Sequence, residues 1–303
     1  MSEALIIVNP AAGGEPDAAV PDVVDRCGRW FDAVTVHHTR RPGEATELAR
    51  AAAGSADVVV TVGGDGTARD VAHGLAGAAP PMFIVPAGTA NSCYRTLWGE
   101  RPWRQALETA LSERAGSPRR FDLARLVEPD RLVLAGACTG FPPQAIHDAG
   151  AITDLVGRAR YEAALIRLIP RYEPYPGRSV VDGVQVHRGP TLLANVGGSR
   201  YRGGQYEVLP LSILDDGLLD VCVIGAEHPP AEVLTLTRTA AHLTRPGVVY
   251  ARGRRVTIER TDGRPVWFEH DGEVLLDAGD SFTLEVVPAA VAVLAGPAAG
   301  APA

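Results

Sequence analysis

Short apolar runs alternate with helix-forming segments over the first third of the chain. Each run is rich in β-branched or aliphatic residues and ends in turn residues, which is typical of buried parallel strands. The runs are Ala4–Val8, Ala33–Val36, Asp57–Val62 and Met82–Val85. Between them, Glu44–Ala53 and Thr67–Ala76 have helix-forming composition and follow glycine-containing turns. The repeated strand–helix unit predicts an α/β domain with a parallel sheet over residues 1–120.

From about Phe121 the pattern changes to β-like segments separated by turn residues. The expected strands are Arg131–Ala135, Ser179–Val186, Thr191–Val196, Leu218–Ile224, Arg255–Arg260 and Ser281–Val287. A helix is expected over Ile152–Leu168, where apolar residues recur at helical spacing. The predicted fold is an N-terminal Rossmann-like domain, completed by a strand near residues 288–295, and a mainly antiparallel β-sandwich domain over 121–287.

Composition excludes several classes of function. The chain has 303 residues and a net charge of −7, which argues against non-specific nucleic-acid binding and against membrane attachment by overall charge. It contains no lysine, so a Schiff-base mechanism and a phosphate-binding loop of the Walker type are both excluded.

Cysteine spacing and the chain ends indicate a cytoplasmic protein. Cys27, Cys93, Cys138 and Cys222 are far apart and show neither zinc-ligand spacing nor a disulfide framework, so we expect buried, reduced thiols. No apolar run has the length of a membrane span or of a signal peptide. We expect a frayed tail over Ala295–Ala303.

A glycine-rich loop follows the third apolar run. Gly63-Gly64-Asp65-Gly66-Thr67 joins this strand to the next helix, and such a loop lets backbone N–H groups approach a polyphosphate. The Asp65 carboxylate is suited to positioning magnesium or accepting a proton. A plain strand-to-helix turn with Asp65 as a helix cap is the alternative, and a lone glycine pair would favour it.

Two more loops of this kind follow neighbouring strands. Pro86–Asn91 presents Gly88, Thr89 and Asn91, and Asn9–Gly13 follows the first strand. Because the carboxyl ends of parallel strands meet at one edge of a sheet, all three loops should converge. We therefore favour a phosphate site over three unrelated turns.

These loops resemble those of the diacylglycerol kinase catalytic-domain family, which includes sphingosine kinases and bacterial lipid kinases. The resemblance extends over nearly the whole chain, in order and spacing. Its further motifs are Phe121-Asp-Leu123, Gly157-Arg-Ala-Arg-Tyr161, Tyr201-Arg-Gly-Gly204, Pro210, Asp216-Gly-Leu-Leu-Asp220 and Asp271-Gly-Glu273. The glycine-aspartate-glycine loop is shared with NAD kinases and phosphofructokinases, whereas the last two motifs indicate the lipid-kinase branch.

The resemblance implies roles for individual residues. Residues implied to bind or support ATP are Asn9, Thr39, Gly63, Gly64, Gly66, Thr67, Asp70, Gly88, Thr89 and Asn91. Glu273 would be the general base, a task that suits a carboxylate if partial burial raises its pKa, and Asp65 would organise the metal. Asp216 would hold a structural magnesium with the main-chain oxygens of Ile213 and Leu218. From the residues alone, a hairpin turn at Asp271-Gly272 is the favoured explanation of that motif, and a turn at Asp216-Gly217 is the alternative for the other.

The chain also departs from the family pattern. Ser92 stands where the family usually has an aspartate, which leaves the identity of the acceptor open. Pro142 and Pro143 replace part of a Gly-Phe-Asp-Ala segment and should stiffen it.

The resulting expectation is an ATP- and magnesium-dependent kinase that phosphorylates a lipid hydroxyl such as that of diacylglycerol or a sphingoid base. The alternatives are an NAD-kinase-like or other small-alcohol kinase, and a non-catalytic nucleotide-binding module. The helix over 152–168 is more simply a core helix than a membrane contact. Whether the protein forms a homodimer stays open.

Overall fold

A computed structural model describes residues 1–112, 118–276 and 279–296 of the chain. The chain divides into two compact units, which are described separately below. Unit 1 contains Met1–Asp122 and the segment from Pro288 onwards, and unit 2 contains Leu123–Val287. Strands β5 (Arg119–Leu126) and β17 (Ser281–Val293) each pass from one unit to the other.

Unit 1 is built on a parallel sheet. Its strands are β1 (Glu3–Val8), β2 (Ala33–His38), β3 (Val58–Gly63) and β4 (Met82–Pro86), joined at one edge by the end of β17. The order is β17-β4-β3-β1-β2, and each neighbouring pair is parallel. The core strand β3 is buried along its whole length, which explains its uninterrupted apolar run. The parallel sheet expected from the sequence is confirmed.

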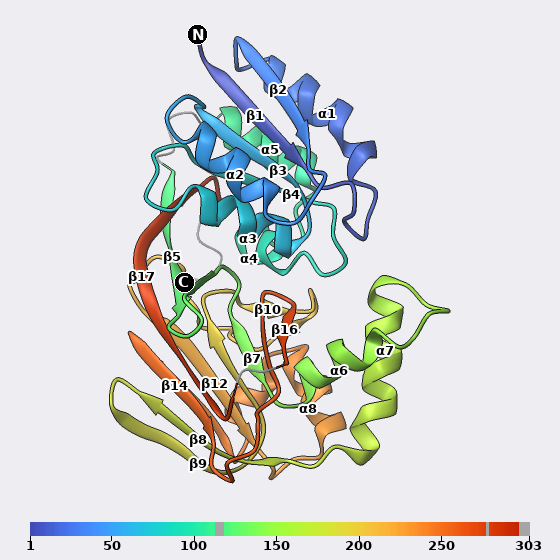
Figure 1. Cartoon of the computed structure of the whole chain (residues 1–303), viewed down its shortest axis with the longest axis vertical. Coiled ribbons are helices and arrows are strands. Elements are labelled where there is room, and N and C mark those ends of the chain that lie inside the picture. The colour runs from blue at the N-terminus through green and yellow to red at the C-terminus, as the bar shows by residue number, and fades with distance from the viewer. Residues whose placement is uncertain (113–117, 277–278, 297–303) are drawn as a thin grey trace. The chain divides into compact units, whose positions relative to one another are not determined.

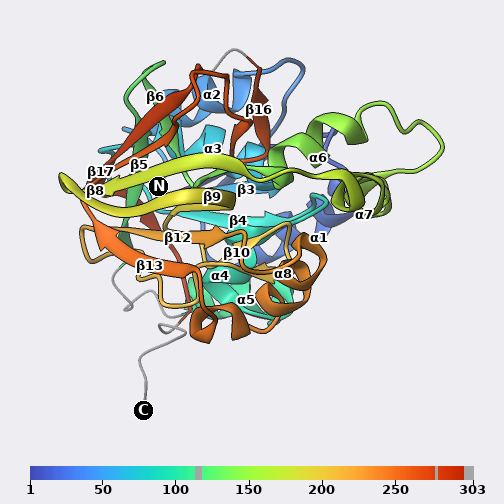
Figure 2. The ribbon, with the colours of Figure 1, turned by 90° about the horizontal axis from the view of Figure 1, so that it is seen from below.

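Helices cover both faces of this sheet. They are α1 (Pro16–Gly28), α2 (Glu44–Ala52), α3 (Asp65–Gly74), α4 (Ser92–Trp98) and α5 (Trp103–Ser112). Within unit 1, α2 and α3 lie on one face, and α1 and α5 pack together on the other (Figure 1, Figure 2). The buried residues of α2, Ala45, Ala49 and Ala52, recur at helical spacing.

Unit 2 is mainly antiparallel. Its further strands are β6 (Arg131–Val133), β7 (Ala137–Thr139), β8 (Tyr175–Val181), β9 (Val184–Gly197), β10 (Tyr201–Arg202), β11 (Tyr206–Glu207), β12 (Leu219–Gly225), β13 (Val248–Gly253), β14 (Arg255–Arg260), β15 (Phe268–His270) and β16 (Glu273–Leu275). Strand β12 shows how the layers form. Leu219, Val221 and Val223 enter the core that the strands share, whereas Cys222 and Ile224 face the helices.

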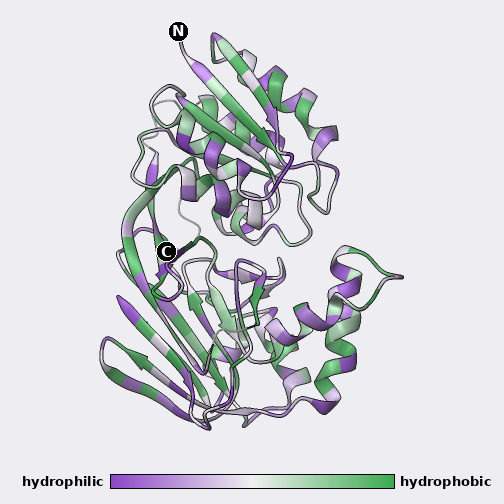
Figure 3. Cartoon of the chain, viewed as in Figure 1, coloured by the Kyte–Doolittle hydropathy of each residue, from purple (hydrophilic) through white to green (hydrophobic). Residues whose placement is uncertain are grey.

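The helices of unit 2 cover the outer faces of β7, β9 and β12. They are α6 (Phe141–Ala149), α7 (Gly157–Leu168) and α8 (Pro230–Thr237), with short 3₁₀ turns η1 (Ile169–Arg171) and η2 (Ala241–Thr244). Side chains from α6 and α7, among them Phe141, Leu165 and Leu168, pack on Cys138, Leu192 and Cys222 of the sheet. The hydropathy colouring shows α7 with both polar and apolar positions along its length (Figure 3).

Several expected boundaries were wrong. The strand expected over Ser179–Val186 is a hairpin, because Asp182 and Gly183 both adopt positive φ and reverse the chain between β8 and β9. The helix expected from Ile152 begins at Gly157, since Val156 is extended. The sequence analysis predicted no helix at α6, where Pro142 and Pro143 lie in the first turn, which needs no proline N–H.

The cysteines, the C-terminal tail and the length of the helices were also predicted from the sequence. The four cysteines are buried and free, as expected. The tail expected from Ala295 lies mostly outside the described residues. Among the residues that are described, no helix combines the length and apolar character needed to cross a bilayer.

The turn between β15 and β16 is fixed by the buried carboxylate of Asp271. Its oxygens accept hydrogen bonds from the backbone N–H groups of Leu134 (3.0 Å), Ala135 (2.6 Å) and Gly136 (3.3 Å). Burial opposes ionisation of Asp271, but His270 and the backbone donors outweigh it and hold the pKa of the carboxyl below its usual value. The carboxylate thus ties this turn to the segment between β6 and β7.

We predict that Asp271→Asn lowers the free energy of unfolding by about 2 kcal/mol at neutral pH, because charge-assisted hydrogen bonds are lost. Asparagine tolerates the positive φ of 49° at this position, so the change isolates the charge. A carboxyl whose folded pKa is depressed stabilises above its ordinary pKa of about 4, and this contribution is lost as the pH falls through the folded value.

Urea unfolding at pH 7 and at pH 3 measures the effect, with Asp154→Asn as the control because Asp154 is exposed. The difference between Asp271→Asn and the wild type should shrink at the lower pH. A variant as stable as the control at pH 7 would contradict the anchoring role.

Candidate active site

The three glycine-containing loops of unit 1 converge at the carboxyl edge of its sheet. The loop after β1 joins that after β4 through Gly14 N–H and the Ala87 carbonyl (3.0 Å). The ends of β3 and β4 join through Ala87 N–H and the Gly63 carbonyl (2.9 Å). The segment after β2 enters the same region, because Thr39 N–H donates to the Val8 carbonyl (2.8 Å).

Close backbone approach explains the glycines of these loops. A Cβ at Gly88 would lie 2.3 Å from Cα of Gly64, and a Cβ at Gly13 would lie 2.5 Å from Oγ1 of Thr89. Real Cβ atoms do not approach other atoms so closely, and at Gly88 the obstruction is backbone. The glycines are therefore required by contact between loops rather than by backbone conformation.

Polar side chains hold the loops in place. Asn9 Nδ2 donates to Thr67 Oγ1 (2.9 Å), and Asn9 Oδ1 accepts from Ala11 N–H (3.0 Å). Asn91 closes its own loop, since its side chain accepts from Gly88 N–H and donates to the Gly88 carbonyl, each at 2.8 Å. Asn91 adopts a φ of 53°, which asparagine tolerates better than most residues.

Asp65 connects two of the loops. Its carboxylate accepts hydrogen bonds from the backbone N–H groups of Ser92 (3.0 Å) and Cys93 (2.9 Å), which are the first residues of α4. It therefore caps a helix, though α4 rather than the helix that it begins. Ser92, at the position where the family usually has an aspartate, is buried and supplies one of these N–H groups.

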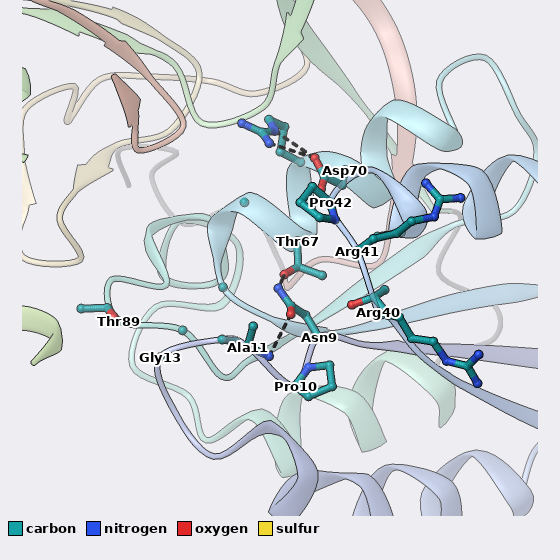
Figure 4. A pocket seen from close by; sticks show the side chains of 17 residues that line it. Asn9, Pro10, Ala11, Gly13, Arg40, Arg41, Pro42, Thr67, Asp70 and Thr89 are labelled. Carbon is teal, nitrogen blue, oxygen red and sulfur yellow. Dashed lines mark hydrogen bonds and ion pairs between the residues drawn. The ribbon is translucent and has the colours of Figure 1, made fainter. Parts of the chain in front are cut away.

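The loops enclose a cavity of about 540 Å³. Its lining residues are Asn9, Pro10, Ala11, Ala12, Gly13, Thr39, Arg40, Arg41, Pro42, Ala45, Gly64, Gly66, Thr67, Arg69, Asp70, Gly88 and Thr89. In the view of Figure 4, Thr89 lies on one side of Asn9 and Thr67, and Arg40 and Arg41 lie on the other. Most of the residues implied to bind ATP line this cavity. Gly63, Asp65 and Asn91 do not line it but form hydrogen bonds that hold its loops.

Cations outnumber anions in the cavity lining. Arg41 Nη1 donates to Glu47 (3.0 Å), and Arg69 pairs with Asp70 (2.9 Å). Within the described part of the chain, the Arg40 guanidinium has no hydrogen bond or ion pair. Arg69 lies within the Gly64–Asp70 segment that the family resemblance assigned to ATP. Sequence reasoning missed Arg40 and Arg41, although their position just after the carboxyl end of β2 was a signal that could have revealed them.

Unit 2 presents a second group of carboxylates, in the β15–β16 turn. Glu273 begins β16, its side chain is 44% exposed, and its Oε1 pairs with Arg131 Nη1 at 2.9 Å. Besides Asp271, the turn has a buried glutamate, Glu269, which accepts from Gly272 N–H (2.8 Å). Burial raises the pKa of Glu269, and Arg202 opposes that shift. Glu269 on β15 is thus more deeply buried than Glu273 on β16.

The Asp216 turn does not fit a magnesium ion. Asp216 Oδ1 accepts from Leu218 N–H (3.1 Å), and Oδ2 bonds to the Arg252 guanidinium. A positive group therefore already stands at the carboxylate implied to hold the metal. Over residues 1–112, 118–276 and 279–296, no three His, Cys, Asp or Glu side chains gather as a metal site.

Comparison with known proteins identifies relatives of both units. Residues 3–126 match the family model of the diacylglycerol kinase catalytic domain, and residues 136–295 match that of the YegS C-terminal NAD kinase beta sandwich-like domain. A diacylglycerol kinase from Mycobacterium tuberculosis is 30% identical over 253 residues, covering 82% of this chain and 79% of that one. A diacylglycerol kinase from Staphylococcus haemolyticus is 26% identical, covering 84% and 78%.

Solved structures share the fold. A diacylglycerol kinase from Bacillus anthracis superposes with a TM-score of 0.74 at 22% identity, covering 99% of this chain and 98% of that one. An NAD kinase from Archaeoglobus fulgidus in complex with ATP gives a TM-score of 0.56 at 16% identity, covering 96% and 93%. The family models and the Mycobacterium tuberculosis relative together show that the chain belongs to the diacylglycerol kinase catalytic-domain family and carries its kinase catalytic domain.

Proposed function

We propose that the protein is an ATP-dependent lipid kinase that transfers the γ-phosphoryl group to a lipid hydroxyl, such as that of diacylglycerol or a sphingoid base. The observation that carries this proposal is the arginine-lined cavity of unit 1, enclosed by the glycine loops of a diacylglycerol kinase catalytic domain. Small residues in these loops would let a triphosphate approach the backbone closely, and arginines would supply the positive charge that it requires.

The nucleotide would be held mainly by unit 1. Loop N–H groups and the N-terminus of α3 would bind the phosphates, and Arg40 would supply a cation that is not already neutralised. Magnesium bound to the triphosphate would neutralise further charge. Asp70 is the one carboxylate in the described cavity lining. Its carboxylate would hold that ion if its ion pair with Arg69 opened. Asp65 would act by positioning the loops through α4, rather than as a direct metal ligand.

The chemical step would be a direct phosphoryl transfer. The acceptor oxygen would form a bond to the γ-phosphorus while the bond from that phosphorus to the bridging oxygen breaks, and ADP would leave. Glu273 would take the proton of the acceptor hydroxyl. Glu273 is paired with Arg131, so this arginine would have to turn away from the carboxylate before the acceptor hydroxyl could approach it.

Relatedness favours a lipid over NAD as the acceptor. The named relatives that align at 26–30% identity over most of the chain are diacylglycerol kinases, whereas the NAD kinase structure is 16% identical. Unit 2 contains a cavity of about 320 Å³ that combines Tyr172, Tyr175 and Trp267 with Arg171 and Arg260. Its mixed lining does not favour either acceptor.

Contact with a membrane surface would bring the enzyme to its substrate. Val156 and Ile166 are 77% and 74% exposed at the start and on the outer side of α7, and Arg158 and Arg167 beside them are also exposed. Exposed apolar side chains flanked by arginines suit an anionic bilayer surface. This contact would be local, since the whole chain carries a net charge of −7.

We predict that Glu273→Gln lowers kcat at least 100-fold, as expected for loss of a general base, and changes KM for ATP little. Transfer of labelled γ-phosphate to diacylglycerol, monoacylglycerol, sphingoid and polyprenol acceptors measures it. Glu259→Gln is the matched control, because Glu259 is another partly exposed glutamate of unit 2 paired with an arginine, Arg178. Unchanged kcat in Glu273→Gln would remove the residue from the chemistry.

The same assay tests the other functions. Labelled NAD or a labelled small alcohol in place of labelled lipid would favour the NAD-kinase-like alternative. ATP binding without transfer to any acceptor would favour a non-catalytic nucleotide-binding module.

We predict that Arg40→Ala raises KM for ATP roughly tenfold with a smaller effect on kcat, because it removes a charge-assisted contact to the nucleotide. Initial rates at varied ATP and calorimetric titration with a non-hydrolysable ATP analogue measure it. Arg50→Ala is the control, since Arg50 is an exposed arginine of α2 that does not line the cavity. Equal KM values for the two variants would show that Arg40 does not bind the nucleotide.

A further inference from the structure

One arginine contacts two aspartates of the Asp216-Gly-Leu-Leu-Asp220 motif. Arg252 on β13 bonds to Asp216 Oδ2, and its Nε lies 3.4 Å from Asp220 Oδ1. Asp220 and Arg252 are directly opposite each other in the antiparallel ladder of β12 and β13. The strand register therefore places the Arg252 backbone beside Asp220, and the arginine side chain reaches from there to Asp216.

Burial makes a counter-charge necessary at this motif. Asp220 has no exposed surface, and its Oδ1 also accepts a hydrogen bond from the Tyr250 hydroxyl at 2.8 Å. A buried carboxylate is costly unless a cation and hydrogen-bond donors compensate it. Arg252 supplies a cation and Tyr250 a neutral donor, both at Oδ1. Burial still raises the pKa of Asp220 to about 6, so these partners offset only part of its cost.

Protein groups also occupy both carboxylate oxygens of Asp216 in its turn. Asp216 Oδ1 accepts from Leu218 N–H, and Gly217 adopts the positive φ of 75° that the turn requires. Both carboxylate oxygens are thus engaged, one by a backbone donor and one by Arg252. A divalent cation at this position would have to displace a guanidinium that stays charged at every accessible pH.

We propose that Arg252 is the permanent counter-ion of Asp216 and Asp220, and that this motif stabilises unit 2 without binding magnesium. The arginine replaces the structural metal that the motif implies. Any magnesium that the enzyme needs then enters with the nucleotide alone. This inference concerns the folding of unit 2 and does not depend on the acceptor or on the catalytic roles proposed above.

Thermal unfolding of the full-length protein tests the proposal, followed by circular dichroism without nucleotide. The wild type is measured after EDTA treatment and again with excess MgCl₂, and the two Tm values should agree. Arg252→Met keeps the aliphatic part of the side chain but removes the guanidinium, and it should lower Tm by about 5 °C or more. Arg255→Met is the matched control, because Arg255 is an exposed arginine paired with Glu285 on the neighbouring strand, and it should change Tm far less.

Two results would overturn the proposal. One is a wild-type Tm that rises with MgCl₂ and no longer rises in Asp216→Asn, since this would show a magnesium site at that carboxylate. The other is an Arg252→Met variant that keeps the wild-type Tm. If Arg252→Met does not fold, the comparison of wild type with Asp216→Asn in EDTA and MgCl₂ still decides whether the motif binds the metal.

Discussion

The contact between the backbones of Gly64 and Gly88 is the constraint on which the candidate active site depends. It brings the loops after β3 and β4 so close that neither can carry a larger residue without one of them moving. The carboxylate of Asp65 can then reach the first N–H groups of α4, and the loop after β1 closes over the Ala87 carbonyl. A single close approach thus determines where the cavity lies and which backbone donors remain accessible.

Because the chain has no lysine, its side chains that stay positively charged at physiological pH are all arginines. Arginine keeps its charge under all physiological conditions and can engage two oxygens in one plane. This property suits Arg40 in a cavity proposed for a triphosphate and suits Arg252 between two aspartates. Glu273 is likewise paired with an arginine, Arg131.

Much of unit 1 could be predicted from the sequence, because buried parallel strands produce uninterrupted apolar runs and loops at their carboxyl ends must converge. Boundaries in unit 2 were harder. The hairpin at Asp182-Gly183 divides what was expected as one strand, although Asp-Gly between apolar residues is a turn signal that was available in the sequence. Helix α6 was not predicted, since prolines lie in its first turn. The partners of Asp65 and Asp216 could not be predicted at all, since Ser92 and Arg252 lie 27 and 36 residues away and only tertiary packing brings them together.

Glu269 and Glu273 show why carboxylates in one short turn can differ in chemistry. Glu269 is buried, and burial raises its pKa, whereas Glu273 is partly exposed and paired with Arg131. A raised pKa alone would nominate Glu269 as the proton acceptor. Accessibility argues the other way, because a group that receives a proton from a substrate hydroxyl must reach hydrogen-bonding distance of it. Glu269 already holds Gly272 N–H within the turn, so it is better placed to fix the turn, while Glu273 remains accessible to an acceptor.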